Sequence, residues 1–79
     1  MQNIQIADLP ITVRSAAQFV KDCLPEGRGF ATSQTVTHLL EIALESARST
    51  KRTEDVDLVR DLDALLRFLQ RRDAQLVWA

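Results

Sequence analysis

The sequence predicts a mainly α-helical fold, a three-helix bundle with an extended N-terminal arm. Apolar side chains recur at helical spacing in three segments, polar residues and prolines mark the ends of those segments, and β-branched residues gather in the first thirteen positions. We therefore expect a single domain over residues 1–79, with an arm at 1–13, helices at 15–24, 33–48 and 54–73, and a C-terminal tail at 74–79.

The arm is typical of extended backbone. Ile4 and Ile6 alternate with Gln5, which favours a short strand at about residues 3–6, and the β-branched run at 11–13 favours a second one. Pro10 disfavours a central strand. An extended arm that packs on the helices without forming a strand is the alternative.

The first helix is expected to begin at Ser15 and to end at Leu24. Ser15 and Gln18 have the spacing of a capping box, in which two side chains satisfy backbone N–H groups of the first turn. Pro25 ends the helix, because the residue before a proline avoids helical geometry. The apolar stripe of this helix includes Cys23, which we expect to be a small buried side chain rather than a nucleophile.

A loop follows at residues 25–29 and leads to the second helix. Arg28 stands between two glycines, which indicates either a flexible turn or a contact loop anchored by this arginine. The expected buried face of the second helix consists of Val36, Leu39, Leu40, Ala43, Leu44 and Ala47. His38, Glu41 and Glu45 share the opposite face, which favours a solvated surface over a metal site.

The third helix carries the strongest pattern. Thr53 is the expected N-cap, and acidic residues in the first turn and arginines in the last turns complement the helix dipole. A coiled-coil-like seam is formed by Leu58, Leu62, Leu65 and Leu69, widened by Val59 and Leu66 and extended by Phe68. The helix at 54–73 is therefore also a candidate for pairing with its copy in a homodimer.

The C-terminal residues 76–79 are apolar. They are expected to form either a short two-stranded pairing with the N-terminal arm or an apolar flap on the helices.

Composition excludes several classes of function. The chain is 46% hydrophobic and has a net charge of -1, which is typical of a globular domain and not of a polybasic nucleic-acid or membrane segment. One cysteine and one histidine argue against a disulfide framework, a zinc site and nucleophilic catalysis. We expect no enzymatic activity, no cofactor, no metal and no membrane span, and a cytoplasmic, bacterial protein.

More apolar side chains are present than three short helices can bury. Ile42 and Phe68 lie away from the main stripes of their helices, and Trp78 lies near the C-terminus. Such a surplus indicates a protein–protein interface. The expected partner-binding residues are Ile42, Leu66, Phe68 and Trp78, with Arg28, Arg67 and Arg71 at the rim. The alternative is that Ile4, Ile6 and Leu9 of the arm cover this surface within the chain.

An apolar arm, a helix ending at Leu24-Pro25, a glycine loop and two further helices resemble the order of elements in some short proteins of alphaproteobacteria. The chain is also similar in size, acidity and helix content to small antiactivators that sequester transcription factors in conjugative elements. This resemblance implies a protein that binds and masks a transcription regulator, and it assigns no role to any single residue.

Two other functions are open at this point. Arg48, Lys51 and Arg52 form a basic cluster that fits a small DNA-binding regulator or antitoxin. The acidic residues interspersed along the third helix disfavour nucleic acid as its ligand. A structural or chaperone-like subunit of a larger assembly is the second alternative.

Overall fold

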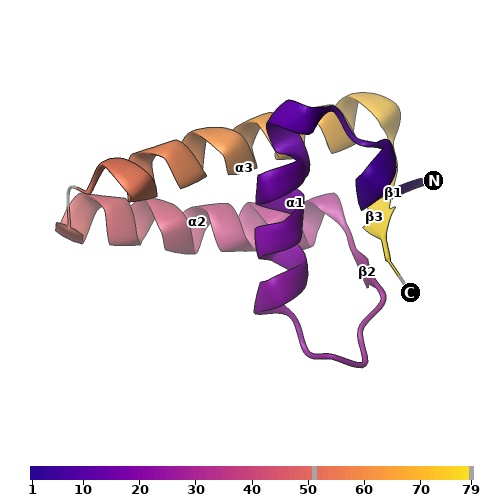
Figure 1. Ribbon diagram of the computed structural model, residues 1–79, viewed down its shortest axis with the longest axis horizontal. Helices are drawn as coiled ribbons and strands as arrows, with labels where there is room; N and C mark the ends of the chain where they lie inside the picture. The colour runs from indigo at the N-terminus through magenta and orange to yellow at the C-terminus, as the bar shows by residue number, and fades with distance from the viewer. Residues whose placement is uncertain (51, 79) are drawn as a thin grey trace.

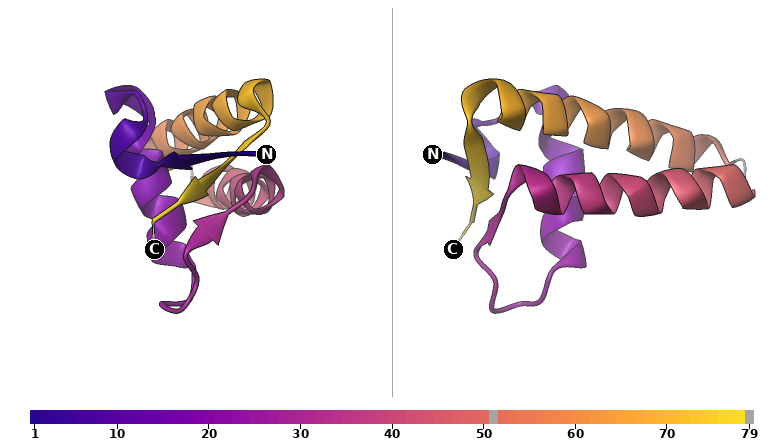
Figure 2. Two further views of the ribbon diagram at one scale, coloured as in Figure 1. Left: turned by 90° about the vertical axis from the view of Figure 1, so that its right-hand side faces the viewer. Right: turned by 180° about the vertical axis from the view of Figure 1, so that it is seen from behind.

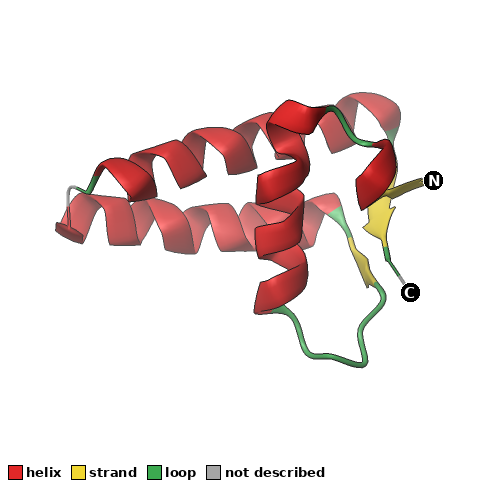
Figure 3. Cartoon of the chain, viewed as in Figure 1, coloured by secondary structure: helices red, strands yellow, loops and turns green. Residues whose placement is uncertain are grey.

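The computed structural model describes residues 1–50 and 52–78. Its elements are β1 (Gln2–Gln5), the 3-10 turn η1 (Ile6–Asp8), α1 (Ile11–Cys23), β2 (Phe30–Ala31), α2 (Ser33–Thr50), α3 (Thr53–Arg72) and β3 (Ala74–Val77). The chain is mainly helical, with helices close to the three predicted segments and a small sheet in addition (Figure 3).

The helices are arranged as a hairpin with a third helix across it. α2 and α3 run antiparallel to each other, and α1 crosses them instead of lying alongside (Figure 1). The strands and both chain ends lie at one end of the hairpin (Figure 2). The three helices therefore do not lie side by side as expected for a bundle, because α1 crosses the other two. α1 has 13 residues and is shorter than α2 and α3, which have 18 and 20.

The sheet joins the two ends of the chain. Its order is β1-β3-β2, with β1 parallel and β2 antiparallel to the central β3. Leu76 of β3 pairs with Ile4 on one side and with Ala31 on the other. The strand pairing of the two ends is thus present, whereas the two-residue strand β2 was not anticipated from the sequence.

The start of α1 differs from two predictions, a strand at residues 11–13 and a helix that begins at Ser15. Residues 11–13 are helical rather than extended, and the N-cap is Pro10, with no side-chain cap. Ser15 therefore lies inside the helix, and the Gln18 amide donates to the Asp22 carboxylate at 3.0 Å instead of capping. The helix start is held by Arg14, whose guanidinium donates to the carbonyls of Leu9 and Ala7 at 2.9 and 3.0 Å.

The ends of α3 are also defined by its backbone. Its N-cap is Arg52, one residue before the expected Thr53, and no side-chain hydrogen bond caps it. The helix ends at Arg72 because Asp73 adopts the left-handed conformation, with φ 48°. Asp is one of the few residues other than glycine that take this conformation at modest cost, and it turns the chain into β3.

The core lies between the hairpin, α1 and the sheet. The predicted leucine seam of α3 packs in the core of the chain itself. Leu62, Leu65 and Leu69 are fully buried, and Leu58 is half-buried. A homodimer through this seam would therefore require these leucines to leave the core. Leu44 was expected to be buried with its neighbours on α2, but it is 37% exposed.

Truncation of a core leucine should be costly. Leu69→Ala is expected to lower the free energy of unfolding by about 2–5 kcal/mol, because it removes a fully buried side chain and leaves a cavity. Leu44→Ala, at a position that is 37% exposed, is the control, with a smaller expected loss than Leu69→Ala. Urea unfolding followed by circular dichroism measures both, and equal midpoints for the two variants would contradict this account of the core.

Candidate functional site

An apolar groove of about 410 Å³ lies where α1 crosses the hairpin. Because α1 is shorter than the hairpin, the far parts of α2 and α3 extend beyond it (Figure 1). The groove is lined by Phe19 and Cys23 of α1, by Leu39, Ile42, Ala43 and Ser46 of α2, and by Asp55 and Leu58 of α3. We call this surface the hairpin groove.

Ile42 is the most accessible large apolar side chain of the hairpin groove. It is 54% exposed, whereas Phe19, Leu39 and Leu58 are half-buried and pack against the core. The groove therefore has a fixed apolar floor and one projecting aliphatic side chain. Ile42 was predicted as a partner-binding residue, and it is the one member of that set that lies in the hairpin groove.

Cys23 corrects a prediction, since its side chain is exposed at the hairpin groove and not buried in the stripe of α1. Its neighbour Val20 is fully buried, so α1 leaves the core surface in its last turn. Partial burial, followed by the negative charge of Asp22, raises the pKa of the Cys23 thiol. The thiol is therefore protonated near neutral pH and is a weak nucleophile.

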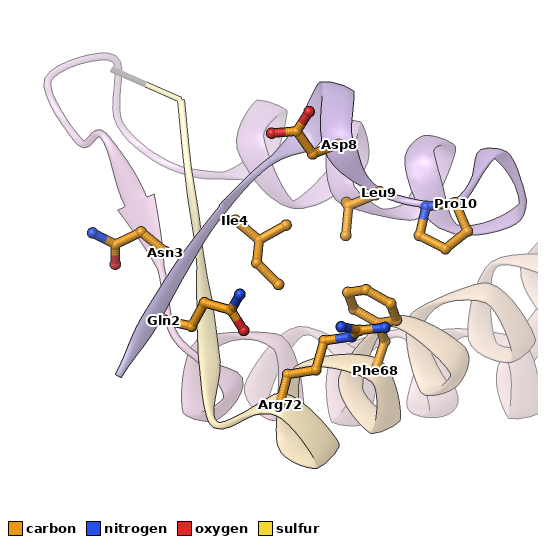
Figure 4. Close-up of a pocket in the computed structure, with 8 residues that line it drawn as sticks. All are labelled: Gln2, Asn3, Ile4, Asp8, Leu9, Pro10, Phe68 and Arg72. Carbon is orange, nitrogen blue, oxygen red and sulfur yellow. The ribbon is translucent and has the colours of Figure 1, made fainter.

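Leu66 and Phe68 pack largely against other residues of the chain. Leu66 is 9% exposed and belongs to the core, so it is not available as a surface anchor. Phe68 is half-buried beside Ile4, Leu9 and Pro10 of the N-terminal segment (Figure 4). The guanidinium of Arg72 lies 4.5 Å from the centre of its ring. Phe68 and the N-terminal segment therefore line the same hollow, and Phe68 remains partly exposed.

Arg67 and Arg71 lie near Phe68 at the end of α3. Arg67 pairs with the Asp63 carboxylate at 3.1 Å, and Arg71 is exposed. Both line a second hollow, of about 440 Å³, together with Thr12 of α1. These arginines belong to the surface around Phe68 and not to the hairpin groove.

Trp78 and Arg28 hold the glycine loop against the sheet. The Trp78 indole N–H donates to the Arg28 carbonyl at 2.8 Å, and its backbone N–H donates to the Gly29 carbonyl at 3.0 Å. The Arg28 guanidinium donates to the Phe30 carbonyl and to the Thr35 hydroxyl. Both side chains are half-buried. The predicted partner-binding residues therefore do not form one surface: they lie in the hairpin groove, around Phe68 and at this loop.

The sequence did not indicate Phe19, Leu39 and Leu58 as surface residues, because helical periodicity assigned them to buried stripes. The usable signal was length. A helix of 13 residues spans about 20 Å at 1.5 Å per residue, so it covers only part of a hairpin whose helices span about 27–30 Å.

The remaining polar candidates are solvent-facing. His38, Glu41 and Glu45 are exposed, and among the described residues no three His, Cys, Asp or Glu side chains gather closely enough to hold a metal ion. Arg52 of the basic cluster pairs with Glu54 at 3.0 Å, Arg48 is exposed, and Lys51 lies outside the described residues. None of the helices in residues 1–50 and 52–78 combines the length and hydropathy needed to cross a bilayer.

Comparison of the chain with protein-family models, with curated proteins and with solved structures finds no match.

The raised pKa of Cys23 has a measurable consequence. At a pH near the ordinary thiol value of about 8.5, folded Cys23 should react with a disulfide reagent more slowly than the same thiol in urea-unfolded protein. The reason is a smaller thiolate fraction in the folded state. Asp22→Asn should speed the reaction by removing the neighbouring negative charge. Asp8→Asn, outside the groove, is the control, and faster reaction in the folded chain would refute the assignment.

Proposed function

We propose that this chain is a regulatory protein without enzymatic activity, which binds and masks another protein through the hairpin groove. The observation that carries the proposal is an open apolar groove between three helices, lined by Ile42, which is 54% exposed. Two other predicted anchors, Phe68 and Trp78, are half-buried, and the Trp78 indole N–H donates to the Arg28 carbonyl.

The energetics favour a partner at this place. Burying a fully exposed side chain of this size contributes about 1.5–3 kcal/mol, and Ile42, which is 54% exposed, would contribute about half of that. The half-buried floor adds further apolar area. Grooves between helices commonly accept side chains of a partner segment, whose apolar anchors match the spacing of the groove. Ile42 is therefore the expected central anchor of the complex.

The polar groups of the groove fit binding better than catalysis. Its thiol is held protonated by partial burial and by Asp22, and the Asp55 carboxylate accepts a hydrogen bond from the Thr50 hydroxyl. General acid–base or nucleophilic catalysis requires a base within hydrogen-bond reach of the reacting group. The described residues of the groove include no histidine or lysine that fills this role.

We place the partner among bacterial transcription regulators and the complex in the cytoplasm. This assignment follows the similarity in size, acidity and helix content to small antiactivators. Masking requires that the bound chain cover the regulator's functional surface, so the regulator should be inactive in the complex.

Ile42→Ser is the direct test. Tagged wild-type chain, Ile42→Ser and Leu44→Ser are used to capture proteins from the native host, and the partner is identified by mass spectrometry. The affinity of the purified partner for each variant is then measured by calorimetry. We expect Ile42→Ser to weaken binding by about tenfold or more, since it removes a central apolar anchor.

Leu44→Ser is the matched control, because Leu44 is an exposed leucine on the same helix that does not line the groove. It should bind like the wild type, and circular dichroism should show both variants folded. Wild-type affinity in the Ile42→Ser variant would refute the proposed function, as would a partner whose activity is unchanged in the complex.

A further inference from the structure

We infer that the occupant of the hairpin groove is a basic amphipathic helix supplied by the partner. This inference rests on the proposed function and names the chemistry of the segment that is bound. It follows from the shape of the groove, from its position on helices and not on a sheet edge, and from the charge around it.

The shape of the groove favours a helix. Leu39, Ile42, Ala43 and Ser46 line it at spacings of i, i+3, i+4 and i+7, so its α2 side is a stripe of about 10 Å along two turns. Leu58 forms the α3 side and Phe19 the wall on α1. Apolar side chains at the same spacing on a partner helix would meet this stripe along its length.

The backbone around the groove disfavours an extended peptide. A bound strand pairs with a sheet edge, and the groove residues lie on helices, which present no such edge. The strands lie at the opposite end of the hairpin from its far, uncovered half (Figure 1). A helix satisfies its own backbone and requires only side-chain contacts from the groove.

The charge around the groove is negative. The first half of α3, residues 53–62, carries four acidic residues, Glu54, Asp55, Asp57 and Asp61, against one basic residue, Arg60, which pairs with Asp57 and Asp61. Glu54 pairs with Arg52, which precedes the helix. The second half carries one acidic residue, Asp63, which pairs with Arg67, and in addition Arg71 and Arg72. α3 is therefore acidic at the groove and basic at the sheet end.

Individual carboxylates extend this acidity to the other two helices. Asp55 lines the groove, and Asp22 is close enough to act on the Cys23 thiol, which also lines it. Both accept hydrogen bonds from neutral groups, the Thr50 hydroxyl and the Gln18 amide, and among the described residues neither forms an ion pair. Glu45 is three residues from Ile42 and therefore adjacent to it on the surface of α2.

Complementarity selects the partner. An apolar stripe bordered by carboxylates attracts a helix that carries Lys or Arg beside its apolar face, and repels one that carries Asp or Glu. The bound segment should therefore pair three or four apolar anchors with flanking basic side chains.

Three synthetic peptides of about 18 residues, five helical turns, test the inference with the full chain. The first places Leu at helical spacing with Lys elsewhere, the second has the same Leu positions with Glu, and the third scrambles the Leu/Lys sequence. Binding is measured by fluorescence anisotropy and by protection of Cys23 from a thiol reagent. We expect the Leu/Lys helix to bind about tenfold tighter than either other peptide, to protect Cys23, and to bind more weakly as salt is added.

Two variants locate the contact. Ile42→Ser should weaken binding of the Leu/Lys peptide, and the double variant Asp22→Asn/Glu45→Gln should weaken it and reduce its salt dependence, while Leu44→Ser should change neither. Equal binding of the Leu/Glu or scrambled peptide, or no effect of the double variant, overturns the inference. A dimer of this chain that is lost in Ile42→Ser, measured by sedimentation, also overturns it, because a second copy would then fill the groove.

The two proposals fail in different ways. If Ile42→Ser weakens the complex with the native partner but the Leu/Lys peptide binds no better than the Leu/Glu peptide, the masking function stands and the basic helix is refuted. If Ile42→Ser leaves the native complex unchanged, the groove is not the partner site, and both proposals are refuted.

Discussion

The arrangement of this molecule depends on the pairing of β3 with strands on both of its sides. Leu76, fully buried in β3, pairs with Ile4 of β1 and with Ala31 of β2. α1 lies between these two outer strands in the sequence, so the chain leaves the sheet before this helix and returns to the sheet after it. α1 crosses the hairpin, and the far part of the hairpin extends beyond it (Figure 1). The hairpin groove lies at this crossing.

Electrostatics gives the two ends of the hairpin different characters. Acidic residues at the start of α3 and arginines at its end both complement the helix dipole, which accounts for their order along the helix. The same order places negative charge beside the apolar groove and positive charge beside Phe68 and the sheet. One local stabilising pattern thus produces two surfaces that would select different ligands.

The sequence predicts the three helices and the buried face of α3 well. Leu62, Leu65 and Leu69 recur at helical spacing, which places them on one face of the helix, and that face is buried. It predicts the start of α1 poorly, because that start depends on Arg14 donating to carbonyls five and seven residues earlier. The exposure of Cys23 depends on where α1 crosses the hairpin. Helical periodicity in the sequence cannot predict this tertiary arrangement. For the candidate site, the angular position of Ile42 on its helix predicted its exposure. The partial exposure of the groove floor was not predicted, because an apolar stripe does not specify what packs against it.

The lengths of the outer strands have a consequence for solubility. β1 has four residues and β2 only two, and both are edges of the sheet. An edge strand presents unpaired backbone groups that can recruit strands of other molecules, and this hazard grows with the length of the edge. The 3-10 turn after β1 and the glycine loop before β2 end each edge within a few residues. The sheet can therefore close the fold while offering little template for edge-to-edge aggregation.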